Sequence, residues 1–116
     1  MLTKFFATYL KQSRGCIVNV SCDKGSRPDP GMIAYCMAKA GLDALTKSTA
    51  MELAAFGVRV NAVAPCTTDT NMYRMAGCSE TENSLLMKRA AGNIPLQRVC
   101  RDDEVAKAII FLTSEK

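Results

Sequence analysis

The stretch that decides the fold is residues 15–65, GCIVNVSCDKGSRPDPGMIAYCMAKAGLDALTKSTAMELAAFGVRVNAVAP. Its residues 16–20 are apolar and β-branched, which is typical of a strand buried on both faces of a parallel sheet. Residues 32–56 are rich in Ala, Leu, Met and Lys and hold no Pro, so they predict a long helix that Gly57 ends. Residues 58–63 predict a second strand. Strand, helix and strand together form a βαβ unit, whose crossover is almost always right-handed.

Shorter elements are expected on both sides of this unit. Apolar residues at helical spacing predict a first helix, and Gly15 stands where a glycine commonly follows a helix end. A last helix is expected to begin with Asp102 or Asp103 as its N-cap. The first helix is expected over residues 2–12. The sequence also predicts loops over residues 21–31 and 66–79 and a weakly amphipathic helix over residues 80–91.

The chain has 116 residues, so we treat residues 1–116 as one domain at most. Only two strands are visible, and two strands make a poor sheet on their own. Strands that are apolar on both faces also need helices on both sides of the sheet. We therefore expect a partial α/β domain, a βαβ unit with flanking helices that belongs to a larger doubly wound parallel sheet.

Composition excludes several classes of protein. Hydrophobic residues make up 48% and charged residues 22%, which is ordinary for a globular protein, and no apolar run is long enough to cross a membrane. The absence of His excludes Ser-His-Asp triads and His-based metal sites. The six cysteines form no CxxC pair, so no metal site is expected. The net charge of +4 comes from scattered Lys and Arg, so nucleic acid is not an expected partner.

The N-terminal residues indicate a compartment. They lack the apolar core and cleavage site of a secretory signal, so we expect free thiols and a cytoplasmic protein. Lys4, Lys11 and Arg14 precede the first acidic residue, which faintly resembles an organelle transit peptide. A mitochondrial location therefore stays open.

Tyr35 and Lys39 are the residues with an evident chemical use. They are four positions apart in the long predicted helix and so share one face of it. A nearby ammonium lowers the pKa of a Tyr hydroxyl from its ordinary value near 10, because it stabilises the phenolate. The pair therefore fits general acid/base chemistry. The same spacing also arises by chance, with a half-buried Tyr beside a solvated Lys, and the surrounding motifs have to choose between these interpretations.

Those motifs come in a set order along the chain. GCIVNVSC ends 13 residues before Tyr35, NAVAP ends at Pro65, and CTTDT follows over residues 66–70. IPLQRV occupies residues 94–99, directly before a segment that contains DDEVAKAIIFLTSE. This ordered set resembles the short-chain dehydrogenase/reductase family over essentially the whole chain, and in particular its classical subfamily, which includes enzymes like the 3-oxoacyl-carrier-protein reductases. The resemblance implies a Rossmann-like sheet.

The resemblance also implies roles for single residues. Tyr35 would protonate the substrate carbonyl oxygen, while Lys39 would lower the pKa of Tyr35 and bond the nicotinamide ribose. Pro65, Thr68 and Thr70 would lie in the loop that holds the nicotinamide, with Thr70 bonding its carboxamide. The implied cofactor is NAD or NADP, contacted by Tyr35 and Lys39 as well, and the implied substrate is a small carbonyl compound or alcohol.

Larger segments acquire roles in the same way. Residues 71–91 would form a mobile lid over the substrate, where loop chemistry selects the substrate. The helices over residues 2–12 and 32–56 would make the face through which the family forms homo-oligomers. The substrate itself and the choice between NAD and NADP cannot be read from these residues.

The sequence departs from the family's pattern at two positions. Cys22 stands where the family places its catalytic Ser, and a thiol is a weaker hydrogen-bond donor than a hydroxyl. The neighbouring Ser21 can replace it only if the strand end shifts by one residue, which would turn the side chain to the other side. Cys66 stands where the family has a Gly after Pro65, and it would be strained if that position needs a positive φ.

The cofactor's pyrophosphate normally rests on closely spaced glycines at a helix N-terminus. No two of the seven glycines here are closer than six residues, so no such loop is present. The family places that loop upstream of the position that Met1 occupies, and it places a final strand after the position of Lys116. We therefore expect the catalytic half of an NAD(P)-dependent oxidoreductase, inactive as these 116 residues alone. The alternative is a non-catalytic, truncated family member that acts by binding or by oligomerising.

Overall fold

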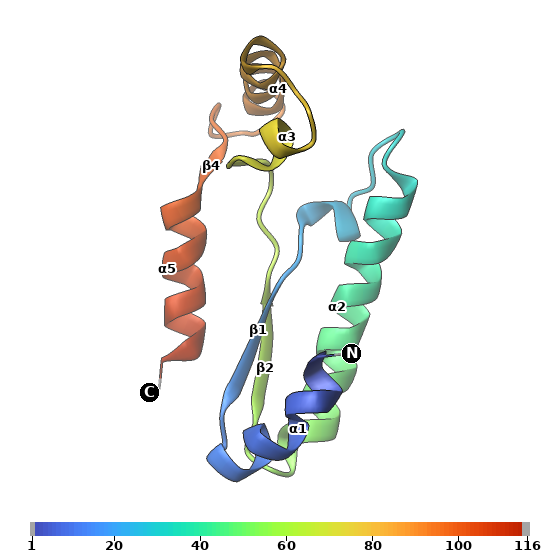
Figure 1. Ribbon diagram of the computed structural model, residues 1–116, viewed down its shortest axis with the longest axis vertical. Coiled ribbons are helices and arrows are strands. Elements are labelled where there is room, and N and C mark those ends of the chain that lie inside the picture. The colour runs from blue at the N-terminus through green and yellow to red at the C-terminus, as the bar shows by residue number, and fades with distance from the viewer. Residues whose placement is uncertain (1, 115–116) are drawn as a thin grey trace.

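A parallel βαβ unit forms the centre of the computed structural model, which describes residues 2–114. Strand β1 (Cys16–Val20) pairs in parallel with β2 (Arg59–Val63), and α2 (Ile33–Ala54) makes the connection between them. The two strands run side by side along the long axis of the molecule (Figure 1). This arrangement confirms the strand–helix–strand interpretation of the central stretch.

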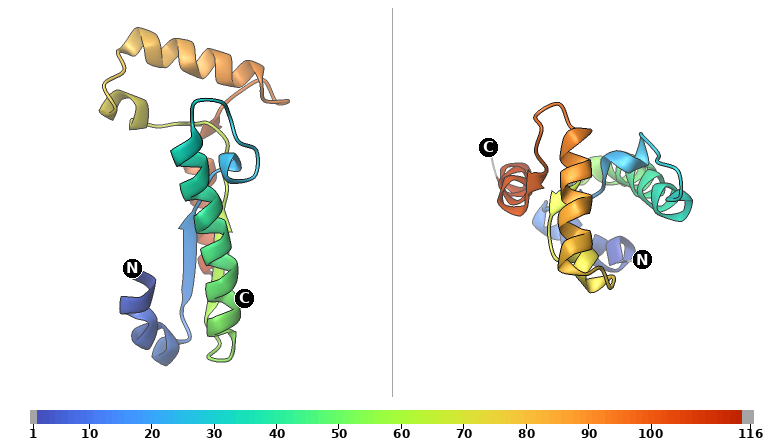
Figure 2. Two further views of the ribbon diagram at one scale, coloured as in Figure 1. Left: turned by 90° about the vertical axis from the view of Figure 1, so that its right-hand side faces the viewer. Right: turned by 90° about the horizontal axis from the view of Figure 1, so that it is seen from above.

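Helices lie on both sides of the strand pair. Helix α2 packs along one side, and α5 (Asp102–Thr113) packs along the other, in contact with both strands (Figures 1 and 2). Helix α1 (Leu2–Ser13) lies at the end of the molecule where β1 begins (Figure 1). The layering confirms the expected α/β class. The buried apolar cluster at this end consists of Leu53, Val58 and Val60, with Leu10, Ile17 and Ala50 packed against it.

An arm crosses the carboxyl ends of β1 and β2. It contains β3 (Thr68–Asp69), α3 (Met72–Met75), α4 (Glu80–Gly92) and β4 (Cys100–Arg101), and β3 pairs in parallel with β4. The expected loop over residues 66–79 is therefore wrong where β3 and α3 form. Elements of two to four residues are too short to show a hydrophobic period, and β3 exists only because β4 pairs with it.

The loop expected over residues 21–31 also contains a short element. A single 3-10 turn, η1 (Asp23–Gly25), follows β1 and packs against α2. Gly25 allows this close approach: a Cβ there would lie 3.1 Å from the backbone nitrogen of Ala40 and 2.7 Å from the carboxylate of Asp43.

The end of α1 differs in detail from the expectation. Arg14, not Gly15, adopts the left-handed conformation after α1, with φ 51°, and the Gly15 N–H donates to the Leu10 carbonyl at 3.1 Å. Gly57 follows α2 with φ 72°, as predicted for a glycine that ends a helix. After α1 and after α2, a single residue with positive φ reverses the chain. The sequence alone did not show which residue after α1 would adopt this conformation.

The start of α5 corrects a second expectation. Neither Asp102 nor Asp103 is the N-cap, because both already lie inside the helix and Arg101 occupies the cap position. The Glu104 carboxylate reaches back and accepts the Arg101 N–H at 2.9 Å. The acidic residues of the first turn still favour the positive end of the helix dipole.

The molecule is open for its length. Its radius of gyration is 16.4 Å, whereas a compact domain of this size has about 13 Å. Its accessible surface is 8343 Å², against roughly 6,200 Å² for a compact monomer of this mass. The excess of about 2,000 Å² reflects helices with exposed apolar faces and a strand pair that, within residues 2–114, has no further strand on either edge. Among residues 2–114, no helix combines the length and the apolar character needed to span a membrane.

Candidate active site

The loops that leave β1 and β2 run side by side and form one wall of a cavity. The parallel pairing continues past both strands, since Ser21 N–H donates to the Val63 carbonyl at 2.8 Å and Asp23 N–H donates to the Pro65 carbonyl at 3.2 Å. Beyond this point a cavity of about 700 Å³ opens between η1, the start of α2, residues 65–70 and the α3–α4 arm. In open α/β sheets, ligands bind at the carboxyl ends of the strands, which is where this cavity lies.

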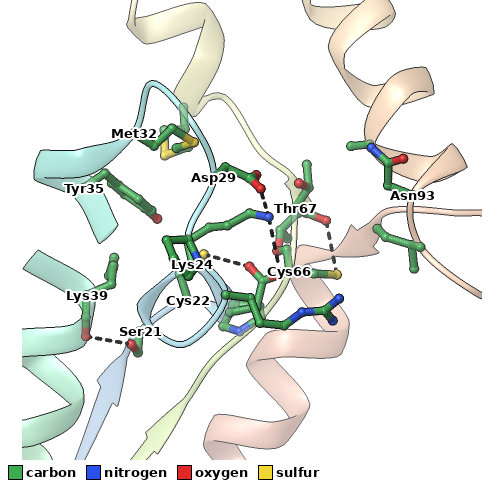
Figure 3. Close-up of a pocket in the computed structure, with 18 of the residues that line it drawn as sticks. Ser21, Cys22, Lys24, Asp29, Met32, Tyr35, Lys39, Cys66, Thr67 and Asn93 are labelled. Atoms are coloured by element: carbon green, nitrogen blue, oxygen red, sulfur yellow. Dashed lines mark hydrogen bonds and ion pairs between the residues drawn. The ribbon is translucent and has the colours of Figure 1, made fainter. Parts of the chain in front are cut away.

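Seven residues were predicted for the site, and all of them line this cavity, Ser21 included. Tyr35 and Lys39 enter it from the first turns of α2, and Cys22 enters it from the end of β1 (Figure 3). The Lys39 Nζ lies 5.6 Å from the centroid of the Tyr35 ring and donates to the Val20 carbonyl at 2.9 Å. The helix thus places both side chains on one face, as the four-residue spacing predicts.

Ser21 and Cys22 are oriented differently. Ser21 is buried, with 3% of its surface exposed, and its hydroxyl donates to the Lys39 carbonyl at 3.5 Å (Figure 3). The strand register is unbroken at this point, so there is no one-residue shift that would turn Ser21 toward Tyr35. Cys22 instead lines the cavity together with Tyr35, and its thiol donates to Asp23 Oδ1 at 3.2 Å.

The pKa of Tyr35 is raised, to about 12. Burial is the main cause, followed by the hydrogen bond with Cys22 and the negative charge of the surroundings, which includes Asp23. This direction is opposite to the lowering expected from Lys39. The Lys39 ammonium has its nearest partner in the Val20 carbonyl rather than in the phenol oxygen, so burial outweighs it.

The segment after β2 supplies the other predicted residues. Pro65, Thr68 and Thr70 all line the cavity. The Thr68 hydroxyl donates to the Cys66 carbonyl at 2.9 Å, and the Thr70 hydroxyl accepts the Met72 N–H at 3.4 Å. Among the described residues the non-glycine positive φ values belong to Arg14 and Gln97, so the strain considered for Cys66 does not arise.

Charged residues of the loop after Cys22 line the cavity and were not expected there. Lys24 Nζ lies 2.7 Å from Asp29 and 3.8 Å from Asp23, and the pKa of Lys24 is raised mainly by its hydrogen bond to Asp29. Tyr73 of α3 and Asn93, just after α4, close the opposite side. The signal for Asp23 was its position directly after Cys22, whereas Asn93 has no such signal because the arm brings it in from a distance.

Comparison with known proteins places the chain in a family. Residues 1–116 match the family model described as Enoyl-(Acyl carrier protein) reductase. The fold and the paired Tyr and Lys thus define an α/β protein of the dehydrogenase class. The chain belongs to the short-chain dehydrogenase/reductase family.

Particular relatives sharpen the comparison. The 3-oxoacyl-(acyl-carrier-protein) reductase of Thermotoga maritima is 39% identical over 116 residues, which cover 99% of this chain and 45% of that protein. The short-chain dehydrogenase srdC of Neurospora crassa is 40% identical over 104 residues, which cover 90% of this chain and 37% of that protein. The chain therefore spans about half the length, or less, of these curated relatives.

Solved structures agree. A Caenorhabditis elegans short-chain dehydrogenase/reductase with its cofactor has a TM-score of 0.89 at 35% identity, covering 96% of this chain and 42% of that one. An NADPH-bound short-chain oxidoreductase of Pseudomonas aeruginosa, described as having an atypical catalytic center, has a TM-score of 0.82 at 33% identity, covering 97% of this chain and 44% of that one.

Proposed function

We propose that the protein to which these residues belong is an NAD(P)-dependent oxidoreductase that interconverts a carbonyl compound and an alcohol. The observation that carries the proposal is the meeting of Tyr35, Lys39 and Cys22 in one cavity at the carboxyl ends of β1 and β2. Relatives that bind NAD+ or NADPH support the cofactor class. When bound, the nicotinamide supplies or accepts the hydride.

The residues present fit the nicotinamide end of such a cofactor. An ammonium has three donors and Lys39 uses one on the Val20 carbonyl, so two remain for ribose hydroxyls. The Thr70 hydroxyl accepts a backbone N–H, which leaves its own proton for a carboxamide oxygen. The Thr68 hydroxyl already donates its proton to the Cys66 carbonyl, so it offers a cofactor only its oxygen lone pairs and its backbone groups. Pro65 lacks an N–H and presents an apolar ring.

The pyrophosphate end has no cradle among these residues. Closely spaced glycines let the backbone approach a pyrophosphate, and the glycines here stand at least six residues apart. The cofactor therefore has to be held partly by segments other than these 116 residues. The oxidoreductase activity is therefore proposed for the whole protein and not for these residues in isolation.

Tyr35 is the proposed proton carrier. With its pKa raised to about 12, the phenol is protonated at neutral pH and is ready to donate to a carbonyl oxygen as that oxygen gains charge. In the reverse direction the phenolate has to form, which requires Lys39 to come closer to the phenol oxygen than it does here. Alcohol oxidation by this site should therefore depend more steeply on pH than carbonyl reduction.

The test is Tyr35→Phe in the protein produced from the complete native reading frame. Oxidation of NADH and NADPH is followed with a panel of ketones and aldehydes. Removing a general acid costs roughly 10²- to 10⁴-fold in rate. Tyr9→Phe is the matched control, because Tyr9 is exposed on α1, away from the cavity. Turnover that survives Tyr35→Phe would remove Tyr35 from this role.

A second candidate is a non-catalytic protein that binds another chain. Phe5 and Tyr9 project from the same face of α1 with 72% and 65% of their surface exposed, and Met51 on α2 is 74% exposed. Burial of these side chains in a homo-oligomer would stabilise the open fold. Light scattering after size exclusion tests it: the protein should be oligomeric, and Phe5→Lys should shift it toward monomer. A cooperatively folding monomer would contradict this candidate.

A further inference from the structure

We propose that Asp23 is a positioning residue whose carboxylate accepts a hydrogen bond from the Cys22 thiol. Cys22 can then accept hydrogen bonds from other groups in the cavity but cannot donate one to them. The chemical consequence rests on the proposed oxidoreductase function. The hydrogen bond itself rests on geometry: Cys22 Sγ lies 3.2 Å from Asp23 Oδ1, and both residues are half-buried in the cavity wall.

The donor capacity of each group decides the direction of this bond. A thiol has one proton, and an ionised carboxylate only accepts, so the proton of Cys22 has to point at Asp23. The sulfur lone pairs are then left for a donor in the cavity, which Cys22 and the Tyr35 hydroxyl line together. The Cys22 S–H is thereby committed to the Asp23 carboxylate, and only the sulfur lone pairs remain for other groups.

The carboxylate is held in place by its own backbone. The Asp23 N–H donates to the Pro65 carbonyl at 3.2 Å, and the Asp23 carbonyl accepts the N–H groups of Ser26 and Arg27 at 3.1 and 2.9 Å. Lys24 lies 3.8 Å from the second carboxylate oxygen. None of the three backbone bonds involves the Asp23 side chain, so a shorter side chain leaves the turn intact.

This polarity determines which form of a substrate Cys22 can assist. A carbonyl oxygen only accepts hydrogen bonds, so it finds no donor at Cys22 and depends on Tyr35 alone. An alcohol hydroxyl has a proton and can donate it to the sulfur. Asp23 therefore favours binding of the alcohol form of the substrate. A thiol or hydroxyl without such a partner could donate a hydrogen bond to the carbonyl form or accept one from the alcohol form.

Infrared difference spectroscopy of the S–H stretching band tests the hydrogen bond. The Cys22 band is isolated by subtracting the spectrum of Cys22→Ser from that of the unchanged protein. Asp23→Ala should move this band to higher frequency, since the thiol loses its acceptor. Asp23→Asn should restore much of the shift, because an amide oxygen still accepts. Asp29→Ala is the control: it removes the same charge from the same loop, but its partner is Lys24.

Either of two results would overturn the proposal: a band that stays in place in Asp23→Ala, or one that moves as far in Asp29→Ala. The band needs no turnover, so its failure leaves the proposed oxidoreductase function standing. Conversely, an inactive protein leaves the band assignment standing. If the protein is active, Asp23→Ala should raise KM for the alcohol and lower it for the carbonyl compound, each by about two- to tenfold, the net worth of one hydrogen bond. An equal change in both would contradict the role in selecting the alcohol form.

Discussion

Gly25 is where the turn η1 rests on the backbone of α2, and Gly25→Ala tests whether this contact sets the geometry of the cavity. A Cβ at residue 25 would lie 3.1 Å from the backbone nitrogen of Ala40, 3.1 Å from the backbone carbon of Lys39 and 2.7 Å from a carboxylate oxygen of Asp43. The Asp43 side chain can rotate away. The two helix atoms cannot, because they belong to the hydrogen-bonded backbone of α2.

The size of the effect follows from these distances. Ordinary contacts of a Cβ begin near 3.4 Å, so the turn has to move away from α2 by about 0.3 Å. Overpacking of this kind costs about 1–3 kcal/mol. The movement also carries Cys22, at the turn's N-cap, away from Tyr35 and Lys39 on α2. Since a misplacement of about 1 Å at an active site can cost roughly 100-fold in rate, a loss of a few-fold is expected here.

Urea unfolding monitored by circular dichroism measures the change in the free energy of unfolding, and NAD(P)H oxidation by the complete protein measures the change in rate. Gly41→Ala is the matched control, because Gly41 lies in the same helix and a Cβ added there would meet no atom within 4 Å. That change should stabilise α2 by up to about 1 kcal/mol. A Gly25→Ala protein as stable as the parent, or a Gly41→Ala protein destabilised to the same degree, would refute the close-approach explanation.

Three further outcomes are expected. Leu53→Ala should cost about 2–5 kcal/mol in unfolding free energy, whereas Met51→Ala in the same helix should cost little, because Leu53 is 5% exposed and Met51 is 74% exposed; equal losses in urea unfolding would contradict this. Arg98 lowers the pKa of Glu104 to about 2, so its stabilisation of α5 is present above pH 4.5 and is lost as the pH falls toward 2; Glu104→Gln should flatten acid unfolding over that range. The pKa of Tyr35 is raised to about 12, so its contribution is present below pH 10 and is lost as the pH rises toward 12; tyrosinate absorbance that Tyr35→Phe removes should appear only near pH 12.

The central βαβ unit was predictable because its signals are local. The apolar run of β1, the long proline-free segment of α2 and the glycine after it each depend on neighbours in the chain, and all three formed as expected. Tyr35 and Lys39 were predictable for the same reason, since helical spacing alone puts them on one face.

The short elements were not predictable. Strand β3 forms only because β4 lies beside it, some 30 residues later in the sequence, and neither strand has a period of its own. The helix ends were also misplaced by one residue, at Arg14 and at Arg101. Small differences between neighbouring residues decide such ends, and contacts from elsewhere in the fold settle them.

The sequence by itself determined the fold class, the family and the two catalytic candidates on α2, because periodicity and motif order are properties of the chain. Only the tertiary structure decided the partners of Ser21 and Cys22, because the strand register and the packing of α2 bring the Lys39 carbonyl to Ser21 and leave Cys22 to Asp23. The tertiary structure also decided that the pKa of Tyr35 is raised and not lowered. Lys39 is close along the helix, but burial and the groups on η1 act through space, and their sum exceeds the effect of the ammonium.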